Sequence, residues 1–403
     1  MMPRRVYVRG VGALTALGGT WPESVAALAE GRSAIGPVRG FDVRNFPSTV
    51  AAAIDGFAHS GDRRLALARV AAREAWVAAG LDTAAPPFER LGVFLGAESG
   101  RAPFETLLAL TRAAGAGSSF DHRQFGVHAR ASAAHFDASL ISPAAVTSVL
   151  AREYGAGGPA LTISLACSSG ASAIAEAARA ISLGVCDFAL CGGVGADIDP
   201  MMLAGFGKLG ALSAHGVSRP FDVRRDGFVV GEGAAMAVLS SERGAACVEL
   251  VGAGRSLDAH HLTAPDPDGE GAALSMRAAL AAAGVKRVDY VQAHGTSTPL
   301  NDAVEAQALR RVLGPCLDDA HVSSVKGALG HWIAGAGALG FLCAHEAIAS
   351  GTVLPTANLA DPDSACALPH VLGRALNKKV TTAMVNAFAF GGANCTLVLR
   401  CCQ

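Results

Sequence analysis

One cysteine of this chain stands where a nucleophile could act, between a strand pattern and a helix pattern. The run Leu161–Leu165 alternates like a strand, and an Ala-rich helical pattern covers Ser172–Leu183. Cys167 therefore falls at or near the first turn of a helix, where free N–H groups and the helix dipole favour the thiolate. Its small neighbours leave room for a substrate: Ala166, Ser168, Ser169 and Gly170. The alternative is a buried cysteine that packs as a small hydrophobic residue, the commonest fate of a free thiol.

Three further segments place polar residues at the ends of predicted strands. His294 opens His-Gly-Thr-Ser-Thr-Pro-Leu-Asn-Asp, and Lys326 and His331 begin and end Lys-Gly-Ala-Leu-Gly-His. The segment Asn386–Asn394 runs from a strand into a glycine loop whose backbone N–H groups could face an oxyanion. Each segment alone is ambiguous, because a lone histidine is more often an ordinary hydrogen-bonded residue. Together they indicate one active site.

Strands and Ala-rich helices alternate along the whole chain, which predicts an α/β fold whose sheets are mostly buried. The predicted strands are Val6–Val8, Leu91–Leu95, Leu161–Leu165, Phe188–Leu190, Val248–Val251, Tyr290–Gln292, His321–Val325 and Met384–Phe388. The predicted helices are Leu65–Ala79, Ser172–Leu183, Ala272–Ala283, Ala303–Leu313 and Gly337–Ala349. No Pro- or Ser-rich linker separates two parts of the sequence.

The composition excludes several classes of protein. The 403 residues suffice for two or three domains or for one large α/β unit. Lys plus Arg is 33 and Asp plus Glu is 34, so the net charge is −1, which argues against a non-specific nucleic-acid binder. Hydrophobic residues make up 51% of the chain, which excludes a disordered protein.

The mean hydropathy of +0.35 raises the question of a membrane protein. The uncharged stretch Tyr154–Ala175 is long enough to cross a bilayer, but it contains Pro159, many glycines and serines, and a strand pattern. The opening Met-Met-Pro-Arg-Arg leads directly into a strand pattern without the apolar segment of a signal peptide. The ten cysteines are scattered and form no Cys-x-x-Cys motif. We expect a cytoplasmic protein with free thiols and no membrane association.

A weak internal echo links the two parts of the chain. The segments Val6–Gly12 and Val248–Gly254 each run as a strand into a glycine turn. Further on, each part has a strand that ends in a small-residue loop before an Ala-rich helix. Such echoes also arise by chance in α/β proteins, so duplication and coincidence are equally open on this evidence.

In their order along the chain, these segments resemble those of the β-ketoacyl-acyl carrier protein synthases, the elongating condensing enzymes of the thiolase-like superfamily. The resemblance covers nearly the whole chain and includes the segments Val8–Gly18, Ser218–Ala234 and Asp258–Thr263. It implies a duplicated thiolase-like α/β fold with five layers, αβαβα, and a mixed sheet in each half. The halves would be residues 1–245, which carry Cys167, and residues 246–403, which carry His294 and His331.

The resemblance implies decarboxylative condensation. Cys167 would accept an acyl group from the phosphopantetheine arm of acyl carrier protein (ACP), and His294 and His331 would stabilise the enolate left when malonyl-ACP loses carbon dioxide. The backbone N–H groups of Cys167 and Phe390 would form the oxyanion hole. Thiolases use a second cysteine as a base, but Cys395 does not match their pattern.

Other residues take supporting roles by the same resemblance. Lys326 would pair with Asp302 and Glu305 and fix the electrostatics of the site. The pantetheine arm would bind at Thr296, Thr298, Gly391 and Gly392. Phe390 would be the gate over the acyl pocket, with Asp258, His261 and Thr263 on a second mobile loop. No cofactor is implied, and a metal at Asp258 and His261 lacks further ligands.

The chain departs from the family pattern at three places. Ala389 replaces a glycine before the gate residue Phe390, and Gly340 replaces a buried glutamate nine residues after His331. The stretch Arg101–Leu140, where the family builds its dimer contact, has no match that can be assigned. Gly335–Gly340 satisfies Gly-x-Gly-x-x-Gly without a strand directly before it, so we interpret it as a helix packed closely through glycines, with no nucleotide site.

Three partners and three functions remain open at this stage. An acidic ACP would bind a local basic patch, for which Arg63, Arg64 and Lys208 are candidates, although the first two could equally be a solvated helix start. The fold implies a homodimer, and a heterodimer with a similar subunit is the alternative.

The candidate functions are fatty-acid elongation, the ketosynthase step of a specialised polyene or polyketide pathway, and a non-catalytic partner subunit. The presence of Cys167 argues against the last of these.

Overall fold

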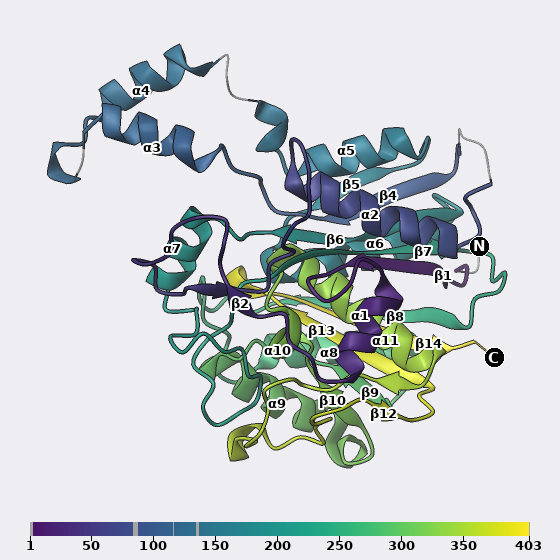
Figure 1. Ribbon diagram of the computed structural model, residues 1–403. Coiled ribbons are helices and arrows are strands. Elements are labelled where there is room, and N and C mark those ends of the chain that lie inside the picture. Colours follow the sequence, from purple (N-terminus) through teal and green to yellow (C-terminus); the bar gives the residue numbers. More distant parts are fainter. Residues whose placement is uncertain (1–2, 84–87, 116, 134–136, 403) are drawn as a thin grey trace.

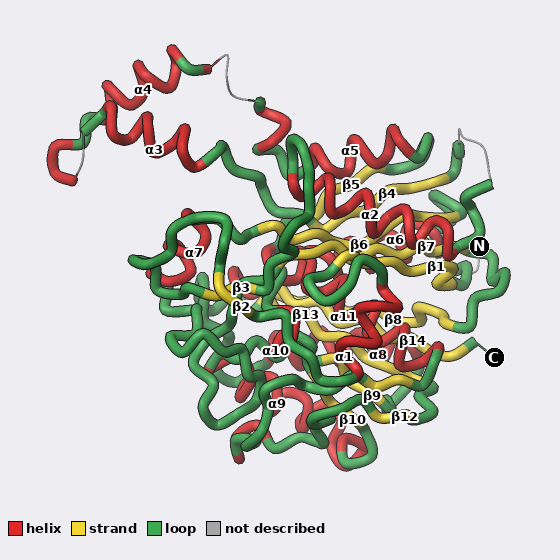
Figure 2. The backbone as a smooth tube through the Cα atoms, in the orientation of Figure 1, coloured by secondary structure: helices red, strands yellow, loops and turns green. Residues whose placement is uncertain are grey.

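The computed structural model describes residues 3–83, 88–115, 117–133 and 137–402. Among them ten strands form one sheet in the order β10-β9-β13-β14-β8-β1-β7-β6-β4-β5 (Figures 1 and 2). The strands of its first half are β1 (Tyr7–Leu14), β4 (Leu91–Gly96), β5 (Ala160–Ile163), β6 (Phe188–Ala196) and β7 (Glu232–Ser240). Those of the second half are β8 (Val248–Leu257), β9 (Tyr290–Gln292), β10 (His321–Ser323), β13 (Thr382–Phe388) and β14 (Ala393–Cys401). Two short ribbons lie outside it: β2 (Gly36–Pro37) with β3 (Val50–Ala51), and β11 (Thr352–Val353) with β12 (Leu376–Asn377).

The two halves of the sheet have the same topology. In the first, β5, β4 and β6 are parallel, and β7 and β1 follow antiparallel. In the second, β10, β9 and β13 are parallel, and β14 and β8 follow antiparallel. The halves join where β1 pairs with β8 at Tyr7 and Val8. The echo between the two parts of the chain therefore reflects a structural duplication, because it lies on β1 and β8, the first strand of each half.

Helices complete a five-layered arrangement. In the first half, α2 (Arg63–Ala78) and α5 (Ala144–Glu153) cover the outer face of the sheet; in the second, α8 (Glu270–Ala283) does so, with α9 (Pro299–Leu313) packed beside it. Between the two halves of the sheet lie α6 (Ser169–Ser182) and α11 (Ala336–Ala349). The predicted αβαβα fold is thus confirmed. The predicted ranges 1–245 and 246–403 each contain one half, although residues 1, 2 and 403 lie outside the described ones.

The central helices approach each other through small residues. A Cβ on Gly337 would lie 2.8 Å from the Ala171 side chain, and one on Gly170 would lie 2.9 Å from the carbonyl oxygen of Ala334. A larger side chain at either position would force the layers apart. The interpretation of Gly335–Gly340 as a closely packed helix is therefore confirmed.

All five predicted helices and eight of the ten sheet strands are present, with boundaries that shift by up to six residues. The two strands that the sequence did not predict are β7 and β14. Every residue of β7 is buried, and its sequence Glu-Gly-Ala-Ala-Met-Ala-Val-Leu-Ser carries neither the alternation nor the β-branched run that marks a strand.

An arm projects from the body of the protein at the stretch that sequence reasoning left unassigned. It contains α3 (Phe104–Ala113) and α4 (His122–Ala131), at the upper left of Figure 1. Arg101 holds one end of the arm by ion pairs of 2.5 Å to Asp197 and Asp199. Arg64 holds the other end by donating to the carbonyl oxygen of Leu140 at 2.9 Å. Residues 116 and 134–136 of this stretch lie outside the described residues.

The smaller helices are α1 (Trp21–Ala29), α7 (Pro200–Lys208) and α10 (Lys326–Leu329). No described helix is both long and apolar enough to cross a membrane. The uncharged stretch Tyr154–Ala175 is divided among β5, a short 3₁₀ helix over Ala166–Ser168 and the first half of α6.

Candidate active site

The three residues predicted to carry the chemistry meet at one point. Cys167 and His294 stand just beyond the carboxyl ends of the parallel strands β5 and β9. His331 follows α10, the short helix that comes after the parallel strand β10. The sulfur and one nitrogen of each ring lie within 4.8 Å of one another, and His331 Nε2 is 3.1 Å from Cys167 Sγ. All three residues line a cavity of about 340 Å³. The duplicated fold thus brings residues from both halves to one site.

The thiol of Cys167 is buried, with only 3% of the residue exposed. Burial raises its pKa to about 11, and the nearby Glu98 carboxylate adds to this effect. Lys326 acts in the opposite direction, as do the backbone N–H groups of Phe390 and of Cys167 itself. Two backbone N–H groups therefore lie near enough to the sulfur to stabilise its thiolate form.

Hydrogen bonds fix which nitrogen of each histidine carries the proton. The backbone N–H of Ile333 donates to His331 Nδ1 at 3.2 Å, so the proton of the neutral ring is on Nε2. The Lys326 ammonium lies 3.3 Å from His294 Nδ1, which places the proton of that ring on Nε2 as well. Burial, together with Lys326, holds the pKa of both rings well below the usual value. Both histidines are therefore neutral donors at neutral pH.

Lys326 directly contacts His294 rather than the carboxylates with which it was predicted to pair. Its ammonium donates to the carbonyl oxygen and contacts the ring of His294, and it forms no ion pair within 4.0 Å of Asp302 or Glu305. The predicted electrostatic interaction with Asp302 and Glu305 is present, since both charges raise the pKa of Lys326, but it acts at longer range because the two carboxylates accept backbone N–H groups instead. Burial lowers the pKa of Lys326 to about 8, although the charge of Glu305 opposes this.

The two carboxylates hold the loop that carries His294. Glu305 accepts hydrogen bonds from the backbone N–H groups of His294 and Gly295, both at 2.8 Å. Asp302 accepts from Thr296 at 2.9 Å and from Ser297 at 3.1 Å. Burial raises the pKa of both carboxyl groups, and the N–H donors oppose this. These residues are positioning groups for the histidine loop.

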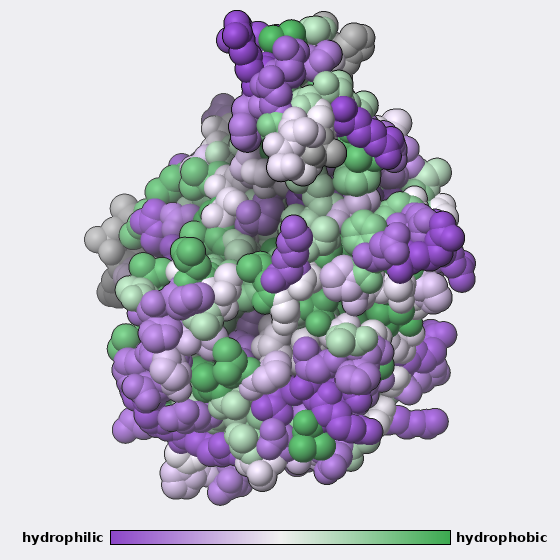
Figure 3. Space-filling model, turned by 90° about the vertical axis from the view of Figure 1, so that its left-hand side faces the viewer, coloured by the Kyte–Doolittle hydropathy of each residue, from purple (hydrophilic) through white to green (hydrophobic). Residues whose placement is uncertain are grey.

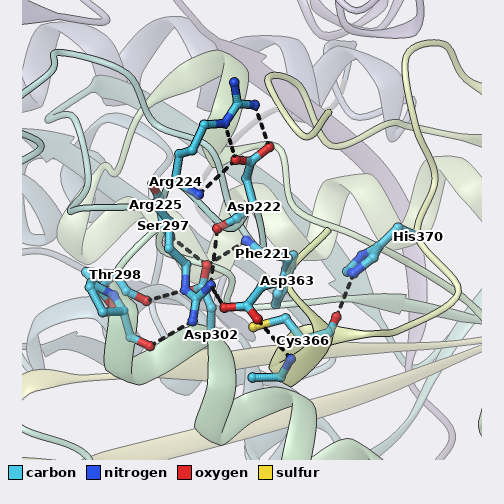
Figure 4. A network of polar contacts seen from close by, with 12 residues as sticks. Phe221, Asp222, Arg224, Arg225, Ser297, Thr298, Asp302, Asp363, Cys366 and His370 are labelled. Carbon is cyan, nitrogen blue, oxygen red and sulfur yellow. Dashed lines mark hydrogen bonds and ion pairs between the residues drawn. The ribbon is translucent and has the colours of Figure 1, made fainter. Parts of the chain in front are cut away.

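Arg225, whose side chain is largely buried, also holds the loop that carries His294 (Figure 4). Arg225 donates to the carbonyl oxygens of Thr298 at 3.3 Å and Pro299 at 3.1 Å. An ion pair of 2.6 Å to Asp363 fixes its guanidinium group. Arg225 was not predicted as a site residue, and only its place in the segment Ser218–Ala234 pointed to it.

The residues predicted to bind the pantetheine arm divide into two groups. Thr296 and Thr298 line the cavity, and their hydroxyl groups lie 2.9 Å apart. Gly391 and Gly392 are not among the described residues that line it, because the N–H of Gly391 donates to the carbonyl oxygen of Leu262 at 2.7 Å. In this conformation the glycine loop is therefore hydrogen-bonded to the loop after β8.

The two loops predicted to move contact each other at the cavity. Phe390 lines it and packs in one apolar cluster with Cys167. Asp258 also lines it and accepts a hydrogen bond of 2.6 Å from Asn394, which joins the loops. His261 is exposed and does not line it; its ring accepts the backbone N–H of Thr263 at 3.1 Å.

The two single-residue departures fit the structure without strain. Ala389 has φ −122° and ψ 152°, an extended conformation that any residue adopts. A Cβ on Gly340 would lie 3.1 Å from Val385 and 3.3 Å from Gln292. The side chain of Gln292 thus fills part of the space that a glutamate at position 340 would need.

Acid should destabilise the protein through the two buried histidines. An unfolded histidine takes up a proton below about pH 6.5, whereas His294 and His331 stay neutral when folded, so stability is lost as the pH falls. Each contributes a loss of up to about 2 kcal/mol between pH 7 and pH 5. Urea unfolding at both pH values should therefore show a smaller loss for His331→Gln than for the wild type. Equal losses would contradict the assignment of a neutral ring.

Two of the three candidate docking residues are used inside the protein. Arg64 is 6% exposed, pairs with Asp62 at 2.6 Å and holds the arm, so its proposed role in docking is wrong. Arg63 forms an ion pair of 2.6 Å with the buried Glu232. Lys208 is exposed at the end of α7, next to Leu209 on the cavity wall. Figure 3 shows the face from which the arm projects, where hydrophilic and apolar residues are interspersed.

Comparisons with known proteins agree with this geometry. The family model described as beta-ketoacyl synthase, N-terminal domain matches residues 3–245, and the one described as beta-ketoacyl synthase, C-terminal domain matches residues 247–360. The chain is 34% identical over 422 residues to a 3-oxoacyl-[acyl-carrier-protein] synthase 2 of Coxiella burnetii, with 99% of each chain covered.

Solved structures are similar over the same length. The ishigamide ketosynthase/chain length factor superposes with a TM-score of 0.86 at 32% identity and 100% coverage of both chains. A type II polyketide ketosynthase in complex with its acyl carrier protein gives a TM-score of 0.85 at 26% identity, with 99% of this chain and 100% of that one covered. Family matches over both halves, together with the Cys-His-His arrangement, show that this chain belongs to the β-ketoacyl synthase family of acyltransferases.

Proposed function

We propose that this protein elongates an acyl chain by two carbons through decarboxylative condensation with malonyl-ACP. The observation that carries the proposal is the pairing of Cys167 with two neutral histidines whose Nε2 atoms carry protons. A nucleophile accepts the acyl chain, and two hydrogen-bond donors match the single oxygen on which charge develops when malonyl loses carbon dioxide.

In the first step, Cys167 Sγ attacks the thioester carbonyl of acyl-ACP. The N–H groups of Cys167 and Phe390 stabilise the oxyanion, and the carbon–sulfur bond to pantetheine breaks. The thiol proton passes to the departing pantetheine sulfur. Because burial raises the pKa of the thiol to about 11, loss of its proton must accompany the attack on the thioester. Thr296 and Thr298 line the path along which the pantetheine arm enters.

In the second step, malonyl-ACP loses carbon dioxide, and the electron pair of the broken bond forms an enolate. The Nε2–H groups of His294 and His331 donate to its oxygen. The enolate carbon then attacks the acyl carbonyl on Cys167, a carbon–carbon bond forms, and the sulfur leaves as a thiolate that takes up a proton. Neutral histidines suit this role because neither needs to gain a proton.

We further propose that no metal or cofactor takes part. A metal ion would need an unprotonated ring nitrogen from each histidine, whereas the donors at Nδ1 keep the proton on Nε2. The decarboxylation itself supplies the carbanion. Cys395 lies in β14 and is not among the described residues that line the cavity, which disfavours a thiolase-type base.

The reaction can be tested with malonyl-ACP labelled in its free carboxyl group. We expect one labelled carbon dioxide for each β-ketoacyl-ACP, and a product two carbons longer than the acyl group supplied. Carbon dioxide release without a longer product, or condensation that retains the label, would contradict the proposal.

Two metabolic pathways are candidates for the place of this reaction. One is fatty-acid synthesis, as the names of the curated relatives suggest, and the other is a specialised polyene or polyketide pathway. The second is favoured by the likeness to the ishigamide ketosynthase/chain length factor. A panel of acyl-ACPs of different length and unsaturation, scored by the acyl group that accumulates on Cys167, separates them.

We propose that the partners are ACP and a second ketosynthase-like chain. The strand β5 is an edge of the sheet, and Leu161 in it is 44% exposed, so it offers an unpaired surface for a homodimer or a heterodimer. Light scattering of the purified chain, alone and with a candidate subunit, distinguishes the two assemblies.

For ACP, we expect Lys208→Glu to raise the KM for acyl-ACP about three- to tenfold with little change in kcat, because the variant repels an acidic carrier. Arg73→Glu is the matched control, since Arg73 is exposed on α2 and not part of the cavity wall. An unchanged KM at low salt would remove Lys208 from the docking surface.

A further inference from the structure

The carboxylate of Glu98 contacts the turn that precedes the nucleophile Cys167. Glu98 stands just beyond β4 and accepts the backbone N–H of Ala166 at 2.9 Å. Its other oxygen accepts the hydroxyl of Ser164 at 2.7 Å, and Ser169 Oγ lies 3.2 Å from the oxygen that accepts the Ala166 N–H. Glu98 therefore binds residues on both sides of Cys167.

The turn that Glu98 binds has an unfavourable backbone conformation at Ala166. Ala166 has φ +46°, in the left-handed region where a residue with a Cβ costs about 1 kcal/mol or more. The N–H of Ala166 points out of the turn, and its hydrogen-bond partner is Glu98. Without that acceptor, a partly buried N–H group would lose its partner and the strained conformation would lose its support.

Glu98 is itself held in place. Arg64 donates to its backbone carbonyl oxygen at 2.5 Å, while the same guanidinium group pairs with Asp62 and reaches Leu140 at the base of the arm. The side chain also lines a second cavity of about 280 Å³, together with Asp197. The Glu98 side chain thus lies between this second cavity and the turn before Cys167.

The charge of Glu98 has a second effect on the thiol. Two charged groups of opposite sign act on the Cys167 thiol, Lys326 and Glu98, while the rings of His294 and His331 beside it are neutral. The positive charge lowers the thiol pKa and the negative charge raises it.

We infer that Glu98 is a positioning residue for the nucleophile: it holds the Ser164–Ala166 turn so that Cys167 and its N–H face the cavity. The purpose given to this arrangement rests on the proposed function, whereas the contacts between Glu98 and the turn do not depend on it. Glu98 does not touch the substrate and acts through the turn and through its charge.

Two variants separate the two effects. Glu98→Gln retains an oxygen that can accept the Ala166 N–H but removes the charge, whereas Glu98→Ala removes both. We expect Glu98→Gln to move the pH profile of Cys167 alkylation by iodoacetamide to lower pH, with a rate about threefold higher at pH 8. We expect Glu98→Ala to lower kcat for condensation about 10- to 100-fold with little change in the KM for acyl-ACP.

Glu30→Gln is the matched control, because Glu30 is exposed and far from the cavity wall. An unshifted alkylation profile in Glu98→Gln would overturn the charge effect, and wild-type kcat in Glu98→Ala would overturn the positioning role. If Glu98→Ala does not fold, Glu98→Asp replaces it, and full activity with this shorter side chain would count against positioning. Alkylation needs no acyl substrate, so a failure of the proposed condensation would leave this readout intact.

Discussion

Replacing Cys167 with glutamine is expected to lower the rate of condensation by at least about 10³-fold while malonyl-ACP still loses carbon dioxide. The variant has no nucleophile, so no acyl group can be held. Its amide oxygen can occupy the place of an acyl carbonyl and accept the N–H groups that face Cys167 Sγ. Decarboxylation depends on His294 and His331, which the substitution does not touch.

Both activities can be followed on the same preparation, as carbon dioxide release and as β-ketoacyl product. Cys316→Gln is the matched control, because Cys316 follows α9 and is not among the described residues that line the cavity. Condensation that survives in Cys167→Gln would show that another residue holds the acyl group. Loss of both activities would show that the two steps are not divided between Cys167 and the histidines as proposed.

Removing either histidine is expected to lower decarboxylation about 10²- to 10³-fold, because each supplies one donor to the enolate oxygen. The effect should be measured in His294→Ala and His331→Ala, each made in the Cys167→Gln background, where acyl transfer does not contribute. Since both donors act on one oxygen, the combined loss should be smaller than the product of the two single losses.

His215→Ala is the control, because this ring is 74% exposed and pairs with Asp226 on the surface. Acyl transfer to Cys167 should persist when either histidine is replaced in a chain that retains Cys167, since the N–H groups near the sulfur come from the backbone. Unimpaired decarboxylation in either variant would contradict the role of that ring.

Local sequence marked Cys167, His294 and His331 as candidates, because each stands near a place where a strand pattern gives way to a small-residue loop, but each was ambiguous alone. That three such loops meet at one point depends on the duplicated topology, and the echo between Val6–Gly12 and Val248–Gly254 was too short to establish it. The family resemblance supplied this step. The structure explains it, since the segments that follow β5, β9 and α10 bring Cys167, His294 and His331 to one cavity.

Polar partners were less predictable, because they depend on which groups compete for a side chain. Asp302 and Glu305 were expected to bind Lys326, but the backbone of the His294 loop occupies both carboxylates. Arg64 was expected on the surface, yet its guanidinium group is buried against Glu98 and Leu140. A sequence shows the charge of such residues but not the carbonyl and N–H groups that the fold places beside them.

Glu98 was missed for the same reason. It follows the strand Leu91–Gly96 in the short segment Ala-Glu-Ser-Gly, and nothing nearby in the sequence marks it as a partner of residues 164–169. Its position after β4 was the available signal, because β4 and β5 are parallel neighbours whose carboxyl ends lie side by side.

The most direct test of the central claim is to follow the acyl group on the enzyme. After incubation with acyl-ACP alone, intact-mass spectrometry should show one added acyl group, and peptide mapping should place it on Cys167. Addition of malonyl-ACP should then remove it and release a β-ketoacyl product with one carbon dioxide. An enzyme that gains no acyl group, gains it elsewhere, or retains it after malonyl-ACP is added would contradict decarboxylative condensation on Cys167.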